Sequence, residues 1–214
     1  MTLVPNSAGE SRPPLTALAL VCTLKDSPER SSSELLSQQV LDELELEGVS
    51  GKLVRVSDFD VHPGVGTDEG EGDQWPGIRD RVAGADILVL GTPIWLGHMS
   101  SVAQRTLERL NAEMSVTDER ERPVMLGKVA VAAVVGNEDG AHKVSADLFQ
   151  GLDDIGFSIP AQGVTYWTGE AMGSTDYRDL DTVPDSVEST TAAVARNAAH
   201  LARLLAMEPY PPYA

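Results

Sequence analysis

The chain has 214 residues, enough for one well-buried domain and too few for two domains of ordinary size. Its 33 acidic and 16 basic residues give a formal net charge of −17, which disfavours nucleic acid and anionic membranes as partners. The single cysteine, Cys22, excludes an internal disulfide framework and lies in an apolar run, so we expect it to be buried.

Residues 1–14 are rich in proline and poor in apolar side chains, and we expect them to form a flexible leader before a single domain at 15–214. The apolar run at 15–22 is short for a signal-peptide core. No run approaches the roughly 20 apolar residues that a membrane span needs. The sequence therefore predicts a cytoplasmic protein that has no membrane partner.

The first strand is expected at residues 17–23, and a hydroxyl-rich loop follows it from Thr23 to Ser33. The apolar spacing after this loop predicts an amphipathic helix whose N-cap is Ser32 or Ser33. A helix N-terminus beside hydroxyl groups can bind a phosphate, although the serines could simply cap the helix. The chain lacks a G-x-x-x-x-G-K-[ST] motif, and no G-x-G-x-x-G follows this strand, so neither the P-loop nor the dinucleotide fingerprint is supported.

A second strand is expected at 52–56, and a short helix at 75–83. Between them, residues 58–73 are rich in glycine and acidic side chains, which is typical of a solvated surface loop. The acidic residues lack the spacing of a calcium loop, so we expect no metal site here.

The third strand is expected at 87–90, where an apolar run is typical of a strand covered on both faces of a parallel sheet. Residues 91–93, Gly-Thr-Pro, are expected to end the strand, and a loop with an exposed Trp95 follows. Ligands of open parallel sheets bind where the strands end, so Trp95 is a candidate ligand platform. The alternative is an ordinary strand with a packed tryptophan.

The clearest buried strand is expected at 128–135, and the loop that follows it, residues 136–142, contains Gly136 and Gly140. Glycines let the backbone approach a ligand closely, but a plain strand-to-helix turn explains them almost as well. The remaining expected elements are a helix at 102–111 capped by Ser100 or Ser101, a polar excursion or oligomer contact at 114–126, a helix at 143–155, a strand at 159–167, an irregular segment at 168–184 and a helix at 186–206.

Alternating strands and helices predict an α/β fold in which the loops after strands one, three and four meet at one sheet edge. Residues 23–33, Gly91-Thr-Pro-Ile-Trp-Leu-Gly-His98 and Gly136-Asn-Glu-Asp-Gly-Ala-His142 together resemble the flavodoxin-like family of NAD(P)H-dependent FMN and quinone reductases. The resemblance extends over residues 15–206. It implies a three-layer sandwich with a five-stranded parallel sheet in the order 2-1-3-4-5, and FMN across the carboxyl edge.

In that family the first loop holds the FMN phosphate, the loop after the third strand lies against the isoalloxazine ring, and the loop after the fourth reaches the ring's other edge. The resemblance carries these roles to Thr23, Lys25, Ser27, Ser31, Ser32 and Ser33, to Thr92, Pro93, Ile94, Trp95, Leu96 and Gly97, and to Gly136, Asn137, Glu138, Asp139 and Gly140. His98 and His142 are candidates for substrate contact, with ordinary surface or core positions as the alternative. Lys25, Glu29 and Arg30 depart from the small neutral loop of the shortest flavodoxins, which leaves the path of the first loop open.

The implied activity is hydride transfer from NAD(P)H to bound FMN, followed by electron transfer to a small acceptor such as a quinone or free flavin. The flavin carries this chemistry, so we assign no catalytic acid or base. A homodimer or homotetramer is expected. One alternative is a flavodoxin-type electron carrier without nicotinamide activity, and another is a flavin-binding accessory protein.

Overall fold

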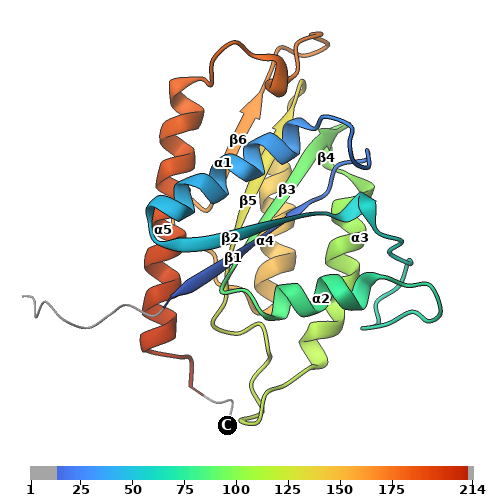
Figure 1. The fold of residues 1–214 in the computed structure, drawn as a ribbon, viewed down its shortest axis with the longest axis vertical. Helices are drawn as coiled ribbons and strands as arrows, with labels where there is room; N and C mark the ends of the chain where they lie inside the picture. Colours follow the sequence, from blue (N-terminus) through green and yellow to red (C-terminus); the bar gives the residue numbers. More distant parts are fainter. Residues whose placement is uncertain (1–13, 212–214) are drawn as a thin grey trace, which may run out of the picture.

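One parallel sheet organises the protein, whose computed structural model describes residues 14–211 (Figure 1). Its main strands are β1 (Leu15–Val21), β2 (Val49–Arg55), β3 (Ile87–Trp95), β5 (Val129–Gly136) and β6 (Val164–Thr168). They lie in the order β2-β1-β3-β5-β6, and β4 (His98–Met99) pairs antiparallel with the end of β3. With this short extra strand set aside, the predicted flavodoxin-like order 2-1-3-4-5 is confirmed.

The central strands are buried because each one alternates between two hydrophobic cores. In β1, Leu18 and Leu20 face one core, whereas Ala17 and Ala19 face the other. The same alternation runs through β3 and β5, because Leu18 pairs in register with Leu88 of β3, and Leu88 pairs with Ala130 of β5. Continuous apolar runs are what a sheet covered on both faces requires, which is why these strands could be located from the sequence.

Helices cover both faces of the sheet and complete a three-layer sandwich (Figure 1). The first face carries α1 (Ser32–Leu46) and α5 (Asp185–Met207), which pack on the core that contains Ala17 and Ala19. The second face carries α2 (Trp75–Ala83), α3 (Ser101–Leu110) and α4 (Ala141–Ile155). Short 3-10 turns are η1 (Val56–Asp58), η2 (Asn111–Ser115) and η3 (Tyr177–Asp179).

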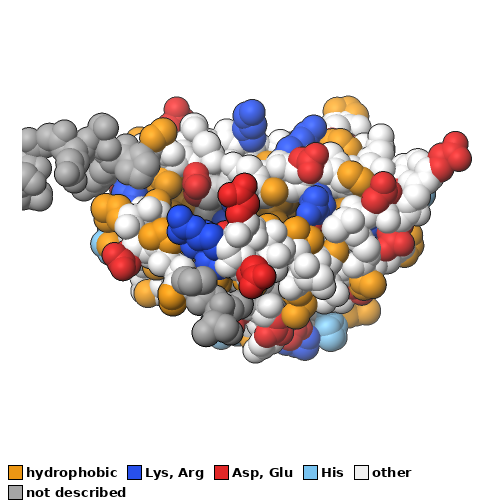
Figure 2. All heavy atoms as spheres, turned by 90° about the horizontal axis from the view of Figure 1, so that it is seen from below, with side chains coloured by type: hydrophobic (Ala, Val, Ile, Leu, Met, Phe, Trp, Pro, Cys, Tyr) orange, Lys and Arg blue, Asp and Glu red, His pale blue; other side chains and the backbone are white. Residues whose placement is uncertain are grey.

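The face seen from below shows acidic, basic and apolar side chains interspersed (Figure 2). The net negative charge is therefore not gathered into one patch at this end of the protein. No helix within residues 14–211 is long and apolar enough to cross a membrane. The expected leader at 1–14 lies almost wholly outside the described residues.

The prediction that residues 91–93 end the third strand is wrong, because β3 continues to Trp95. Thr92 and Pro93 pair with Val134 and Val135 of β5, and this pairing overrides the local Gly-Thr-Pro signal. The neighbouring strand β1 pairs with β3 only as far as Gly91. Beyond that point β3 no longer has β1 beside it, so the missing N–H of a proline is tolerated there.

Two further differences from the prediction have a local cause. The N-cap of α1 is Ser31, whose hydroxyl accepts the N–H of Glu34 at 3.3 Å, one residue before the expected cap. The last strand begins at Val164 rather than residue 159, because Pro160 has no N–H and Gln162 adopts a left-handed conformation with φ 54°. The expected cap at Ser100 is confirmed, since its hydroxyl accepts the N–H of Ala103 at 3.0 Å.

The loop at 58–73 is not wholly solvated, because the side chain of its last residue is buried. The Asp73 carboxylate accepts the Arg109 guanidinium at 2.7 Å, with both side chains at 0% exposure. Burial alone would raise the pKa of Asp73, but hydrogen bonds from the backbone of Glu69, Trp75 and His62 and from Arg109 hold that pKa well below its usual range. This acidic residue therefore anchors its loop to α3.

The lowered pKa of Asp73 predicts a pH dependence of stability. A carboxylate with a depressed folded-state pKa contributes stability that is complete above its unfolded pKa of about 4 and is lost as the pH falls through the folded value. We therefore expect the urea midpoint of the wild type to fall below about pH 4 more steeply than that of Asp73→Asn. Equal slopes for the two proteins would contradict this assignment.

Candidate functional site

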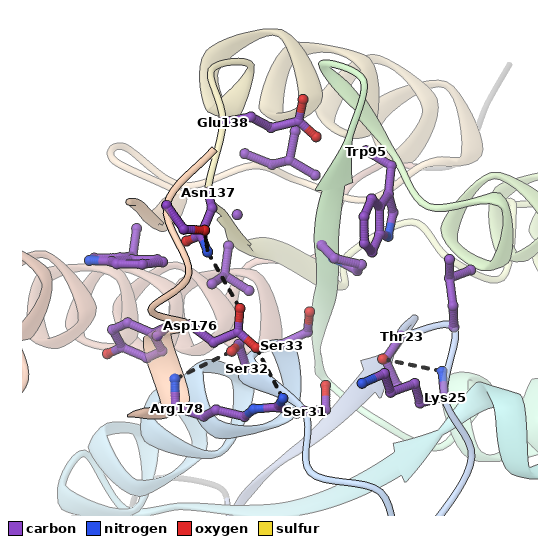
Figure 3. A pocket seen from close by; sticks show the side chains of 18 of the residues that line it. Thr23, Lys25, Ser31, Ser32, Ser33, Trp95, Asn137, Glu138, Asp176 and Arg178 are labelled. Carbon is purple, nitrogen blue, oxygen red and sulfur yellow. Dashed lines mark hydrogen bonds and ion pairs between the residues drawn. The ribbon is translucent and has the colours of Figure 1, made fainter. Parts of the chain in front are cut away.

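A cavity of about 510 Å³ opens at the carboxyl edge of the sheet, where β1, β3 and β5 end (Figure 3). The helix after β1 lies on one face and the helix after β3 on the other, so this is the switch point at which doubly wound sheets bind ligands. The cavity brings together most of the residues predicted from the three loops. These are Thr23, Lys25, Ser31, Ser32, Ser33, Pro93, Ile94, Trp95, Leu96, Gly136, Asn137 and Glu138.

One end of the cavity is formed by hydroxyl groups at the N-terminus of α1. Ser31 caps the helix, while Ser32 and Ser33 in its first turn line the cavity beside it. Thr23, in the loop just after β1, also lines the cavity, and its hydroxyl accepts the N–H of Lys25 at 3.4 Å. The serines therefore both cap the helix and face the cavity, an arrangement that offers N–H and O–H donors to an anion.

The other end carries the indole of Trp95, which is 55% exposed and faces the cavity (Figure 3). This exposure does not fit the alternative of an ordinary packed tryptophan. The tip of its hairpin is held by Leu96, whose backbone N–H donates to Glu138 Oε1 at 2.8 Å. A planar apolar surface is thus fixed beside the loop after β5.

Several predicted residues support the cavity from outside its lining. Ser27 donates its backbone N–H and its hydroxyl to Asp58, at 2.7 and 2.8 Å. Thr92 is fully buried and accepts the N–H of Ser100 at 3.1 Å. Gly97, Asp139 and Gly140 also lie outside the lining. Gly97 belongs to the hairpin that carries Trp95 and lies close to Gly140 in the loop after β5.

Neither histidine that we considered for substrate contact lines the cavity. His98 Nδ1 lies 3.1 Å from Lys143 Nζ. His142 Nε2 lies 3.1 Å from the hydroxyl of Tyr166. Both histidines thus have polar neighbours on the outer side of the site.

The structure adds cavity residues that the sequence did not indicate, and most of them belong to the irregular segment after β6. The Asp176 carboxylate accepts a hydrogen bond from Asn137 at 3.4 Å. The position of this segment in the chain could have indicated them, because a segment that follows a strand of a parallel sheet starts at the carboxyl edge. The added lining residues are Leu24, Arg30, Val135, Trp167, Met172, Gly173, Asp176, Tyr177 and Arg178.

The only cysteine is buried, as predicted, and its Sγ lies 3.6 Å from the hydroxyl of Thr106. Burial raises the pKa of the Cys22 thiol to about 12, so the thiol stays protonated and unreactive at neutral pH. Within residues 14–211 no group of three or more His, Cys, Asp or Glu side chains could hold a metal ion.

Residues 16–172 match the family model described as NADPH-dependent FMN reductase. The chain belongs to the NADPH-dependent FMN reductase family. This match confirms the resemblance read from the three loops. It places the chain among FMN-binding, flavin-dependent oxidoreductases.

Relatives of this FMN reductase family member include proteins with different names. It is 33% identical over 208 residues to the 8-demethyl-8-aminoriboflavin-5'-phosphate synthase of Streptomyces davaonensis, across 92% of this chain and 80% of the synthase. It is 34% identical over 198 residues to the divalent metal cation transporter MntH of Mycobacterium bovis, across 89% of this chain but only 29% of that protein. The crystal structure of RosB with the bound intermediate 8-demethyl-8-formylriboflavin-5'-phosphate is 32% identical, with a TM-score of 0.83 across 92% of this chain and 82% of RosB.

Proposed function

We propose that the chain binds FMN in this cavity, reduces it with NAD(P)H and passes the electrons to a small acceptor such as a quinone or free flavin. The observation that carries the proposal is the chemistry of the cavity's two ends. A phosphate requires donors, and Ser31 to Ser33 supply them at the N-terminus of α1. A flavin ring requires a flat apolar wall, and Trp95 supplies it.

The charge of the lining also fits a phosphate ester. Lys25, Arg30 and Arg178 line the cavity against the carboxylates of Glu138 and Asp176. Three basic side chains thus gather at this cavity in a protein whose formal net charge is −17. A phosphate dianion can therefore be held locally while the rest of the surface remains acidic.

The bound flavin would supply two-electron hydride chemistry, and the chain's residues would orient it. The hydrogen bond between Leu96 and Glu138 fixes the hairpin that presents Trp95. Leu24, Leu96 and Met172 are exposed apolar side chains in the lining. They offer apolar contact area to a planar partner.

The proposal is tested by titrating the purified protein with FMN and then adding NADH or NADPH without oxygen. We expect saturable FMN binding and loss of the visible flavin absorbance with at least one nicotinamide. A protein that binds no FMN would contradict the flavin site. A flavin-loaded protein inert to both nicotinamides would favour the electron carrier instead.

In a second candidate function, the protein is an enzyme that binds the flavin phosphate as a substrate and releases it chemically altered. It is favoured by the 33% identity, over 92% of this chain, to a synthase named for an 8-amino flavin phosphate. The likeness to RosB with a bound 8-formyl flavin phosphate points the same way. Mass analysis of FMN recovered after incubation separates the two candidates, since a cofactor returns with its mass unchanged.

Replacing Trp95 by alanine is expected to weaken FMN binding by about tenfold, because the ring loses its flat wall. Trp95→Phe keeps an aromatic face and is expected to retain most of the affinity. Leu204→Ala, an exposed apolar position on α5, is the control and should leave binding unchanged. Fluorescence titration measures all three, and an unchanged affinity and spectrum in Trp95→Ala would show that the indole is not the ring platform.

The expected homodimer or homotetramer and the cytoplasmic location remain predictions. Analytical ultracentrifugation of the full chain tests the first of them.

A further inference from the structure

The segment from residue 169 to 184, between β6 and α5, extends beyond residue 172, where the family match ends. We call it the β6–α5 segment. It is tied to the loop after β5 because the Asn137 side-chain amide donates to the carbonyl of Gly173 at 3.3 Å. It is tied to the first loop because the Arg178 backbone N–H donates to the Ser32 hydroxyl at 3.3 Å. The segment thus reaches both ends of the cavity.

Arg30 and Arg178 hold the first loop and the β6–α5 segment together reciprocally. The Arg30 guanidinium donates to the carbonyl of Arg178 at 2.9 Å and pairs with Asp179 at 3.1 Å. The Arg178 guanidinium donates in turn to the carbonyl of Arg30 and forms an ion pair with Asp176 at 3.0 Å. The Arg178 side chain is 21% exposed and that of Arg30 is 70% exposed, so Arg178 is the better fixed of the two.

The Arg178 guanidinium retains unused donors. Its hydrogen bond to the carbonyl of Arg30 uses one of five N–H groups, and its Nη2 forms the ion pair with Asp176. Its Nε is buried, lies 3.5 Å from Asp179 Oδ2 and makes no hydrogen bond. Figure 3 shows the side chains of Arg178 and Asp176 directed toward the three serines at the start of α1. A fixed cation with spare donors therefore lies beside the hydroxyl groups.

We propose that Arg178 recognises the 5'-phosphate of the flavin and makes the cavity selective for FMN over riboflavin. The proposal rests on the flavin site proposed above. The serine hydroxyls and the helix N–H groups can serve either a phosphate or a neutral hydroxyl. A guanidinium distinguishes them, because its hydrogen bonds to an anion are charge-assisted and those to a hydroxyl are not. Asp176 orients this guanidinium and is a positioning residue.

The test measures dissociation constants for FMN and riboflavin with wild type, Arg178→Gln and Arg178→Lys. We expect Arg178→Gln to bind FMN about 10- to 100-fold more weakly, and riboflavin within about threefold of wild type. Arg178→Lys keeps the charge without the planar guanidinium, and we expect its affinity for FMN to lie between those of wild type and Arg178→Gln. Inorganic phosphate should compete with FMN on the wild type and much less on Arg178→Gln.

Arg120→Gln is the matched control, because it removes one exposed positive charge from the polar excursion and leaves the cavity lining intact. It should bind both flavins like the wild type. Equal weakening of FMN and riboflavin by Arg178→Gln would overturn the proposal and show that Arg178 only holds the segment in place. If Arg178→Gln does not fold, equal FMN-to-riboflavin selectivity in Arg178→Lys and wild type overturns it. Wild type that binds neither flavin refutes the proposed function itself.

Discussion

Replacing Arg109 by leucine is expected to lower the free energy of unfolding by about 3–5 kcal/mol. The side chains of Arg109 and Asp73 are both fully buried, and the variant leaves the Asp73 carboxylate without its countercharge. It also removes the hydrogen bond from Arg109 Nη1 to the carbonyl of His62, at 2.9 Å. The guanidinium lies 5.7 Å from the ring centroid of Trp75, so a packing contact is lost as well. Urea unfolding measures the difference.

Arg105→Leu is the control for this experiment. Arg105 lies on the same helix and donates to the carbonyl of Val61 at 3.0 Å, so it also ties α3 to the long loop before α2. It has no buried carboxylate partner among the ion pairs of the described residues. We expect its replacement to cost about 1 kcal/mol. If both variants lose a similar free energy of unfolding, the ion pair between Arg109 and Asp73 contributes no more to stability than the hydrogen bond of Arg105.

The burial of Asp73 illustrates what the sequence could not reveal. Glycine and acidic residues around it favour a solvated loop, and the physical reason for its burial is a guanidinium 36 residues away. The extension of β3 to Trp95 has the same kind of cause. Pairing with β5 as far as Pro93, and with β4 at Ile94 and Trp95, overrides a local turn signal, and such pairing becomes visible only when the strands are placed.

The fold itself could be predicted because the apolar runs that define its strands are local features of the sequence. Runs such as 128–135 are apolar throughout, and in a chain that alternates strands with helices this pattern leaves few topologies. The three loops could be located because each follows such a strand. Arg178 and Asp176 could not be placed, since their contacts reach Ser32 and Asn137 across long sequence separations. Their segment has no periodic pattern from which its path could be predicted.

Gly140→Ala is the second substitution for which we expect a large effect, on both stability and FMN binding. Gly140 has φ 128°, a conformation that residues with a Cβ rarely adopt. A Cβ added there would lie 2.8 Å from the Cα of Gly97 in the hairpin that carries Trp95. Backbone strain and this contact together are expected to cost about 2–4 kcal/mol in the free energy of unfolding.

The matched control is Gly70→Ala, because Gly70 also has a positive φ, 99°, but a Cβ there would meet nothing within 4 Å. It carries the strain without the contact, so we expect a cost of about 1–2 kcal/mol and unchanged FMN binding. In Gly140→Ala the hairpin must move away from the loop after β5, which also disturbs the hydrogen bond between Leu96 and Glu138. FMN binding should then weaken even under conditions in which the variant is fully folded. If Gly140→Ala loses no more stability than Gly70→Ala and binds FMN normally, close contact of the two loops does not set the position of Trp95.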